Sequence, residues 1–131
     1  MPSTPRRRAA IDAGVDAIII GNTTIGRPAT LVSGNAAETG GLSGAPLAPL
    51  AREKLAAFRV ATGAALPLIA VGGIADAAEA YARIRAGASL VQLYSALAYE
   101  GPGLPARLLR ELDALLARDG FAHVADAVGA S

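Results

Sequence analysis

The sequence Leu66-Pro-Leu-Ile-Ala-Val-Gly-Gly-Ile-Ala-Asp76 decides the fold, together with Ala86-Gly-Ala-Ser-Leu-Val-Gln-Leu-Tyr94 further along the chain. In the first stretch, an apolar run too short for a buried helix leads into a pair of glycines, which is typical of a buried strand and a tight turn. Asp76 and Glu79 then form the Asp-x-x-Glu signature of a helix N-terminus. The helix is predicted to end at Gly87, and a second apolar run, Leu90 to Leu93, follows. Two buried strands joined by one helix indicate a parallel βαβ unit.

The turn between this strand and this helix is the first candidate for a binding site. Gly72 and Gly73 follow the strand directly, and parallel α/β folds bind their ligands at the carboxyl ends of their strands. Glycines at such a position let backbone N–H groups approach an anion without a Cβ in the way. We therefore expect a side chain placed at Gly73 to occupy the space where the backbone meets a bound phosphate.

A weak internal repeat extends the pattern toward the amino terminus. Residues 12–20 (Asp-Ala-Gly-Val-Asp-Ala-Ile-Ile-Ile) and 85–93 (Arg-Ala-Gly-Ala-Ser-Leu-Val-Gln-Leu) share a helix end, an Ala-Gly pair, two spacer residues and a buried strand. With strands predicted near 16–20, 68–71 and 90–93, the successive βα units favour an α/β fold, either a (β/α) barrel or a doubly wound sheet. All three strands are predicted to be parallel, because right-handed crossovers are the rule for such units.

Helices are predicted around these strands, and one long loop separates the first two strands. The helical ranges are 6–13, 50–62, a helix that begins at Asp76, and an amphipathic helix from Leu104 to the neighbourhood of Gly120. Residues 25–49 form a loop rich in glycine and proline, and loops of this length are usually functional or disordered. Residues 121–131 are predicted to form a packed turn.

Composition limits the chain to one domain, residues 1–131, and excludes several classes of function. The net charge of +1 gives no electrostatic case for a nucleic-acid partner. Because the chain has no cysteine, disulfides, thiolate metal sites and a cysteine nucleophile are excluded. Three strands make about three eighths of a barrel that closes with eight strands, and they would leave open edges. We therefore expect the chain to be part of a larger architecture.

Polar and glycine-rich segments follow the predicted strands. Gly21-Asn-Thr-Thr24 supplies an amide and two hydroxyls suited to a planar polar substrate, although the same residues also suit an ordinary turn from strand to loop. Gly40-Gly-Leu-Ser-Gly44 could place N–H groups on a phosphate or be a simple loop. Tyr94 and Ser95 follow the last strand. In a barrel all these segments meet at one end, so their convergence counts for more than any single motif.

No residue of the chain fits the role of a catalytic base. Lys54 lies within a predicted amphipathic helix and His123 lies in the tail, so solvated or packing roles are favoured for both. Ser43 has no base nearby in the sequence. Arg27 could pair with an anion, but a solvated loop arginine is favoured. We predict a chain that binds but does not catalyse, with no catalytic residue and no metal site.

Several motifs, taken in order, closely resemble dihydroorotate dehydrogenases. They are Asn-Thr-Thr at 22–24, Gly-Gly-Leu-Ser-Gly-Ala-Pro-Leu at 40–47, Val-Gly-Gly-Ile at 71–74 and Gly-Ala-Ser-Leu-Val-Gln-Leu-Tyr-Ser-Ala-Leu at 87–97. The ending, with Gly-Pro-Gly-Leu at 101–104 and Ala-Val-Gly at 127–129, is similar to the quinone-dependent, membrane-associated class. The resemblance covers nearly everything from Ile11 onward. It implies a partial (β/α)8 TIM barrel, of which this chain is the carboxyl-terminal portion, the last three βα units.

The resemblance also implies a cofactor and a set of site residues. The family is a flavoprotein that uses FMN to oxidise dihydroorotate to orotate in pyrimidine biosynthesis. By resemblance, Asn22 and Thr23 hydrogen-bond orotate. The implied cofactor-binding residues are Gly21, Gly44, Gly73, Tyr94 and Ser95, the last three largely around the phosphate. Gly21 departs from the family, where Ser or Thr is common, so the backbone contact is kept and the hydroxyl is lost.

The expected partners, and the alternative functions, depend on family features that this chain lacks. By resemblance, the family's serine base, its flavin-contacting lysine and its membrane-docking segment belong to the amino-terminal half. We expect dihydroorotate or orotate as ligand, quinone through that missing region, a complementary amino-terminal half-barrel as a possible partner, and a location in the cytoplasm or at the cytoplasmic membrane. Two alternatives stay open: a non-catalytic half-barrel that binds phosphate, flavin or a partner, and a relative of inosine-monophosphate dehydrogenase. The missing cysteine counts against the latter.

Overall fold

Three parallel strands form the sheet at the centre of the molecule. The computed structural model describes residues 4–130, and in it β1 (Ile18–Ile20), β2 (Leu68–Val71) and β3 (Ala88–Gln92) lie in the order β1-β2-β3. Both strand pairs are parallel, so the predicted βαβ topology is confirmed. Three parallel strands joined through helices are the arrangement found in part of a (β/α) barrel.

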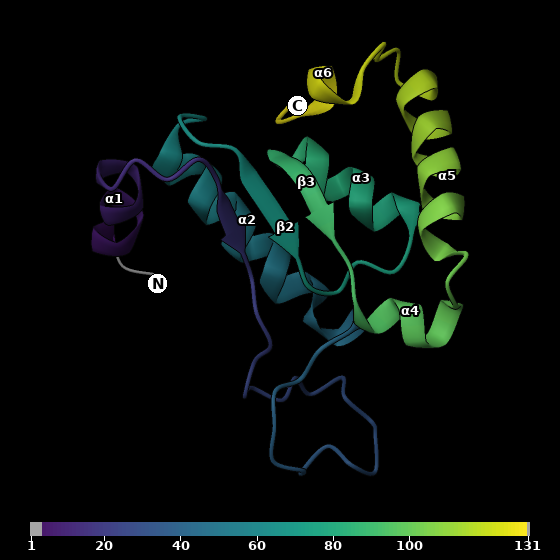
Figure 1. Ribbon diagram of the computed structural model, residues 1–131. Coiled ribbons are helices and arrows are strands. Elements are labelled where there is room, and N and C mark those ends of the chain that lie inside the picture. The colour runs from purple at the N-terminus through teal and green to yellow at the C-terminus, as the bar shows by residue number, and fades with distance from the viewer. Residues whose placement is uncertain (1–3, 131) are drawn as a thin grey trace.

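The helices lie before, between and after the strands (Figure 1). In chain order they are α1 (Thr4–Asp12), the 3-10 helix η1 (Ala45–Leu47), α2 (Ala48–Thr62), α3 (Ala77–Arg85), α4 (Ser95–Glu100), α5 (Leu104–Arg118) and α6 (Val124–Ala127). The sequence predicted α1, α2, α3 and α5 to within a few residues, and it missed the short α4. The packed turn expected at the carboxyl end contains α6, whose Ala127 is buried; Ser131 lies outside the described residues. Within residues 4–130, no helix is long and apolar enough to cross a bilayer.

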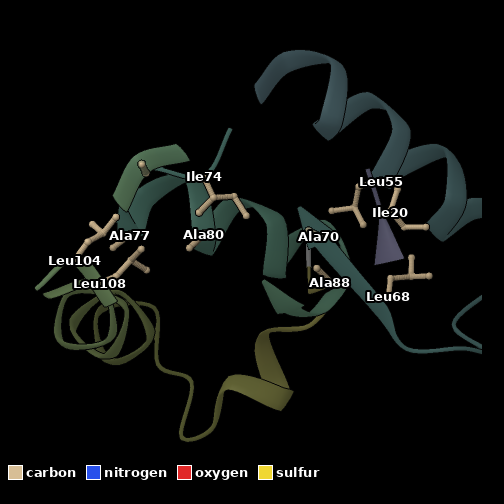
Figure 2. Close-up of a cluster of buried hydrophobic side chains, with 11 residues drawn as sticks. Ile20, Leu55, Leu68, Ala70, Ile74, Ala77, Ala80, Ala88, Leu104 and Leu108 are labelled. Carbon is tan, nitrogen blue, oxygen red and sulfur yellow. The ribbon is translucent and has the colours of Figure 1, made fainter. Parts of the chain in front are cut away.

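The hydrophobic core lies between one face of the sheet and its helices. Figure 2 shows Ile20 and Leu68 facing Leu55 of α2, and Leu104 and Leu108 of α5 lying near Ala77 of α3. Burial of these apolar side chains is the main favourable term that holds the helices on the sheet. Strand alternation then points every second residue away from the helices, onto the opposite face.

The boundaries predicted for the third strand, 90–93, were wrong because of a bulge. Ala88 pairs with Leu68, but the next paired residue of β3 is Leu90, opposite Ile69. Ser89 is therefore an extra residue, and the bulge reverses the alternation of the residues that follow it. As a result Leu90 is 62% exposed. The strand starts two residues earlier than the apolar run suggested.

The face of the sheet opposite the helices carries an uncovered apolar row. Ile19, Ile69 and Leu90 are paired across the three strands. Ile19 and Leu90 are 54% and 62% exposed, and Ile69 is half-buried. In a closed barrel, residues of this face form the packed interior. β1 and β3 are also the two edges of this sheet, as expected for an open part of a barrel.

The start of α3 combines a predicted cap with an ion pair that was not predicted. Asp76 accepts a 2.7 Å hydrogen bond from the backbone N–H of Glu79, which confirms the expected helix N-terminus. The carboxylate of Glu79 binds Arg83 at 2.6 Å and Arg52 at 3.3 Å. Glu79 therefore joins α3 to α2 through Arg52.

Candidate functional site

The carboxyl ends of the strands, the long loop and α4 gather at one end of the molecule, the lower end in Figure 1, while α6 lies at the opposite end. Asn22 and Thr23 follow β1, Gly73 follows β2, and Tyr94 and Ser95 follow β3. Because the strands are parallel, all these residues lie at the same edge of the sheet. The predicted convergence of the glycine-rich and polar segments is thus present.

Two of the predicted cofactor residues lie beside each other. Gly44 precedes η1, which leads directly into α2. A Cβ built on Gly44 would lie 3.7 Å from the Cβ of Ser95. The Ser95 hydroxyl donates a 2.8 Å hydrogen bond to the Oγ of Ser43. The turn before η1 and the end of β3 are therefore joined by a hydrogen bond between two hydroxyls, both of which can also bind a phosphate oxygen.

Gly73 lies against the start of α2, and this corrects an expectation from the sequence. Its φ is +76°, and a Cβ at this position would lie 2.5 Å from the backbone nitrogen of Ala48 and 2.6 Å from its Cα. The space next to Gly73 is filled by the protein's own backbone. A side chain at this position would therefore disturb the packing of β2 on α2 before it could exclude a ligand.

Tyr94 makes a backbone turn after β3 and leaves its ring in solvent. It is the N-cap of α4, and its carbonyl accepts a 3.0 Å hydrogen bond from the N–H of Leu97. Its side chain is 85% exposed. The turn that Tyr94 makes directs the following Ser95 toward Ser43.

Asn22 and Thr23 form a turn at the end of β1. The Oδ1 of Asn22 accepts a 2.8 Å hydrogen bond from the N–H of Thr23, and the Oγ1 of Thr24 accepts a 3.1 Å bond from the N–H of Gly26. The turn interpretation of this segment is therefore correct as local geometry. Both Asn22 and Thr23 remain exposed, so the turn also presents an amide and a hydroxyl to a ligand.

A cavity of about 200 Å³ lies beside this turn, next to β1 and α2. Asn22, Thr23 and Lys54 line it, together with Phe58 and residues of β1. Lys54 is exposed on α2, as the sequence indicated. Its place beside Asn22 could not be read from the sequence, because residues 22 and 54 are brought together only by the packing of α2 on β1.

The backbone explains why Gly21 departs from the Ser or Thr that the resemblance leads one to expect. Gly21 has φ +135°, a backbone conformation that residues with a side chain rarely adopt. A Cβ here would lie 2.5 Å from the carbonyl oxygen of Val71 on β2. In this backbone a hydroxyl-bearing side chain at position 21 does not fit, so only the backbone of Gly21 can contact a cofactor.

One arginine, Arg27, holds the long loop between β1 and α2 together. The guanidinium of Arg27 donates hydrogen bonds of 2.9–3.3 Å to six backbone carbonyls, those of Thr24, Ile25, Gly26, Ala36, Glu38 and Gly40. Arg27 is exposed, as expected for a loop arginine, but its binding of these loop carbonyls was not foreseen. The backbone also pairs Thr24 with Leu42 across the base of the loop.

A buried arginine behind the site was not foreseen. Arg83 on α3 is fully buried and donates to the carbonyls of Gly72 at 2.9 Å and Ala48 at 3.1 Å. It therefore fixes the Gly72-Gly73 turn to the start of α2. The i, i+4 spacing of Glu79 and Arg83 on one helix was the available signal, but no pattern in the sequence indicated that this pair lies inside the protein.

Comparison with known proteins identifies a family to which this chain is similar. The family model described as "Dihydroorotate dehydrogenase" matches residues 6–116. The chain is 61% identical over 121 residues to the dihydroorotate dehydrogenase (quinone) of Sphingopyxis alaskensis, covering 92% of this chain and 34% of the relative. It is 62% identical over 121 residues to that of Rhodospirillum rubrum, covering 92% and 33%. The chain thus spans about a third of the length of the curated relatives it matches.

Two solved structures of dihydroorotate dehydrogenase (DHODH) also match this chain. The ligand-free DHODH from Eimeria tenella matches with a TM-score of 0.93 and 40% identity, over 96% of this chain and 35% of that one. The complex of Eimeria tenella DHODH with ferulenol matches with a TM-score of 0.90 and 39% identity, over 97% and 35%. The partial barrel therefore matches about a third of these larger structures.

Proposed function

Because this chain belongs to the dihydroorotate dehydrogenase family, we propose that it forms one part of the active site of a quinone-linked dihydroorotate dehydrogenase. In this proposal dihydroorotate is oxidised to orotate in pyrimidine biosynthesis, with FMN as cofactor and a quinone as electron acceptor. The observation that carries the proposal is the meeting of the Asn22-Thr23 turn, the Gly44 turn and Ser95 at one edge of the sheet.

Asn22 and Thr23 are proposed to bind the substrate. A side-chain amide and a hydroxyl offer both donors and acceptors, which suits the ring amides and carbonyls of dihydroorotate. Their exposure and the cavity beside them support this assignment. Held in this way, the substrate ring would be oriented for reaction, and orientation of the reactants is a large part of catalysis.

The residues around Gly44 and Ser95 fit the phosphate end of FMN. The two hydroxyls of Ser43 and Ser95 lie 2.8 Å apart, and Gly44 leaves its backbone accessible next to Ser95. We propose that Gly44, Gly73, Tyr94 and Ser95 hold FMN, with Gly21 contacting it through its backbone. When bound, FMN supplies the hydride acceptor for the oxidation.

The proposal places the catalytic base outside these 131 residues. Oxidation of dihydroorotate also removes a proton, and a positioned base typically contributes about 10²–10⁴-fold to the rate. The residues of this chain bind and orient, and the remaining βα units of the barrel would supply the base and the quinone site. A second candidate function is a flavin- or phosphate-binding module without turnover, and the adjacent hydroxyls of Ser43 and Ser95 would suit phosphate binding alone.

The decisive experiment uses a hybrid enzyme in which this chain replaces the matching segment of the Sphingopyxis alaskensis relative. We expect the hybrid enzyme to retain FMN and to oxidise dihydroorotate in a dye-coupled assay, whereas the 131-residue chain with added FMN does not. Asn22→Ala should raise the KM for dihydroorotate, and Ser95→Ala should weaken FMN retention. Ser33→Ala removes an exposed loop hydroxyl and serves as the control.

Three results decide between the candidates. A folded hybrid enzyme that retains FMN without turnover favours the binding module. A hybrid enzyme that binds neither FMN nor dihydroorotate contradicts both candidates. Robust turnover by the chain alone contradicts the placement of the base outside it.

A further inference from the structure

Arg27 connects two segments that lie far apart along the loop. Its side chain donates to carbonyls on the segment that follows the Asn22-Thr23 turn, residues 24–26, and to carbonyls on the segment that precedes Ser43, residues 36–40. The Nη2 group alone reaches two of the latter carbonyls, each at 2.9 Å. One side chain therefore ties both ends of the loop together.

The hydrogen bonds use all three nitrogens of the guanidinium. Arginine has five N–H donors in a fixed planar fork, and all three of its nitrogens, Nε, Nη1 and Nη2, donate to carbonyls here. With its donors engaged in this way, Arg27 has little capacity left to bind an anionic ligand. A lysine could not replace it, because an ammonium group has three donors on a single atom.

The two tied segments each carry part of the proposed site. Thr24 and Leu42 exchange backbone hydrogen bonds of 3.1 and 2.7 Å. Gly41 lies directly against the side chain of Thr23, which is proposed to bind the substrate. The next residue but one, Ser43, accepts the hydrogen bond from Ser95. A continuous set of contacts thus runs from the end of β1 to the end of β3.

We infer that Arg27 is a positioning residue that holds the substrate-binding turn at Asn22-Thr23 in a fixed relation to the cofactor-binding residues Gly44 and Ser95. This inference rests on the proposed function, and it adds that Arg27 acts without contacting the ligand. Loss of Arg27 releases residues 24–26 from residues 36–40. Thr23 then loses its support on Gly41, and the site loses its geometry while the helical core remains.

The test compares Arg27→Ala and Arg27→Lys in the hybrid enzyme with the control Glu38→Ala. Glu38 contributes only its carbonyl to the interaction with Arg27, so its side chain can be removed without loss of that bond. We expect both Arg27 variants to raise the KM for dihydroorotate and to lower kcat/KM, by up to about 100-fold for a misplacement near 1 Å. Glu38→Ala should behave like the parent hybrid enzyme.

Two readouts separate positioning from a loss of folded protein. A mere loss of folded molecules lowers the apparent kcat and leaves KM unchanged, whereas misplacement of Thr23 raises KM. Hydrogen exchange of the Thr24 and Leu42 amides, measured on the 131-residue chain, should accelerate in the Arg27 variants and not in Glu38→Ala. If Arg27→Ala does not fold, Arg27→Lys carries the same test.

Each outcome has one meaning. An unchanged KM in both Arg27 variants, or unchanged exchange at Thr24 and Leu42, overturns the inference. Full rescue by Arg27→Lys also overturns it, because charge rather than the planar fork would then be sufficient. An inactive parent hybrid enzyme counts against the proposed function alone, since the exchange measurement still decides whether Arg27 holds the loop.

Discussion

The guanidinium of Arg83 donates a 2.9 Å hydrogen bond to the carbonyl of Gly72, the first residue of the turn at the carboxyl end of β2. The same nitrogen reaches the carbonyl of Ala48 at the start of α2, and the Nε pairs with Glu79. A fully buried cation thus holds together the three elements β2, α2 and α3 directly behind the proposed cofactor site. Its Nη1 has no partner among residues 4–130.

Replacement of Arg83 should be among the most destabilising changes in the chain. Arg83→Met leaves two carbonyls without their donor. It also removes the 2.6 Å partner of Glu79, whose side chain is only 14% exposed and keeps Arg52 at 3.3 Å. Removal of one partner of a buried ion pair typically costs about 3–5 kcal/mol, and we expect a loss of that order in urea unfolding. Arg52→Ala removes the exposed partner of the same Glu79 and should cost less than about 1 kcal/mol. Equal, small effects of both changes would contradict the role assigned to Arg83.

The parallel sheet and most of its helices could be predicted from the sequence because their signals are local. Apolar runs bounded by glycines mark β1 and β2, and Asp76 marks the start of α3. The start of β3 could not be predicted in this way, since the bulge at Ser89 depends on pairing with β2. The short α4 likewise begins at a turn that Tyr94 makes, without a side-chain cap.

For the site, sequence motifs gave the residues but not their contacts. Asn22, Gly44 and Ser95 were identified by resemblance, and the structure brings Gly44 and Ser95 together. The contacts of Arg27 and Arg83 were not foreseen, because most of them are made to backbone carbonyls, which any residue provides. The expected effect of a side chain at Gly73 is also corrected, since a Cβ there would meet the backbone of Ala48 first.

Gly21→Ser, which introduces the hydroxyl that is common in the family, should destabilise this chain. The backbone of Gly21 has φ +135°, and a Cβ would lie 2.5 Å from the Val71 carbonyl oxygen. Strained backbone conformations of this kind cost about 1–3 kcal/mol each. We expect a loss in that range, measured by urea unfolding followed by circular dichroism. Gly34→Ser is the control, because nothing lies within 4 Å of a Cβ there. Equal stability of the two variants would show that β1 and β2 can separate to admit the side chain.

Stability should fall in acid partly because of Asp119. Hydrogen bonds from Arg118 and Tyr81, together with the charge of Arg85, hold the pKa of the Asp119 carboxyl well below its ordinary value. A group whose pKa is lower in the folded state stabilises the fold above its unfolded pKa, about 4, and this contribution is lost as the pH falls toward the folded pKa. The difference in urea midpoint between the wild type and Asp119→Asn should therefore shrink between about pH 7 and about pH 3. A difference that stays constant with pH would contradict this linkage.

The apolar row on the open face of the sheet should govern association of the chain. Ile19 and Leu90 are 54% and 62% exposed at paired positions on either side of Ile69, and both edge strands lack a neighbour among the described residues. Complete burial of such a side chain is worth about 1.5–3 kcal/mol, and unpaired edges favour association with other chains. We expect the isolated chain to self-associate in sedimentation velocity experiments. A separately produced remainder of the Sphingopyxis alaskensis relative should compete with this self-association and form a one-to-one complex.

The double variant Ile19→Lys and Leu90→Lys tests which face of the molecule mediates association. Lysine side chains in this row should reduce self-association. They should also prevent the complex with the remainder of the relative, because burial of two unpaired ammonium groups in a barrel interior has a large desolvation cost. The matched control, Val60→Lys with Leu109→Lys, makes the same chemical change on α2 and α5, where the side chains are 85% and 67% exposed. The control should associate like the wild type. If instead the control abolishes association as strongly as the sheet variant, the contact lies on the helical surface, and the open face of the sheet is not where the rest of the barrel binds.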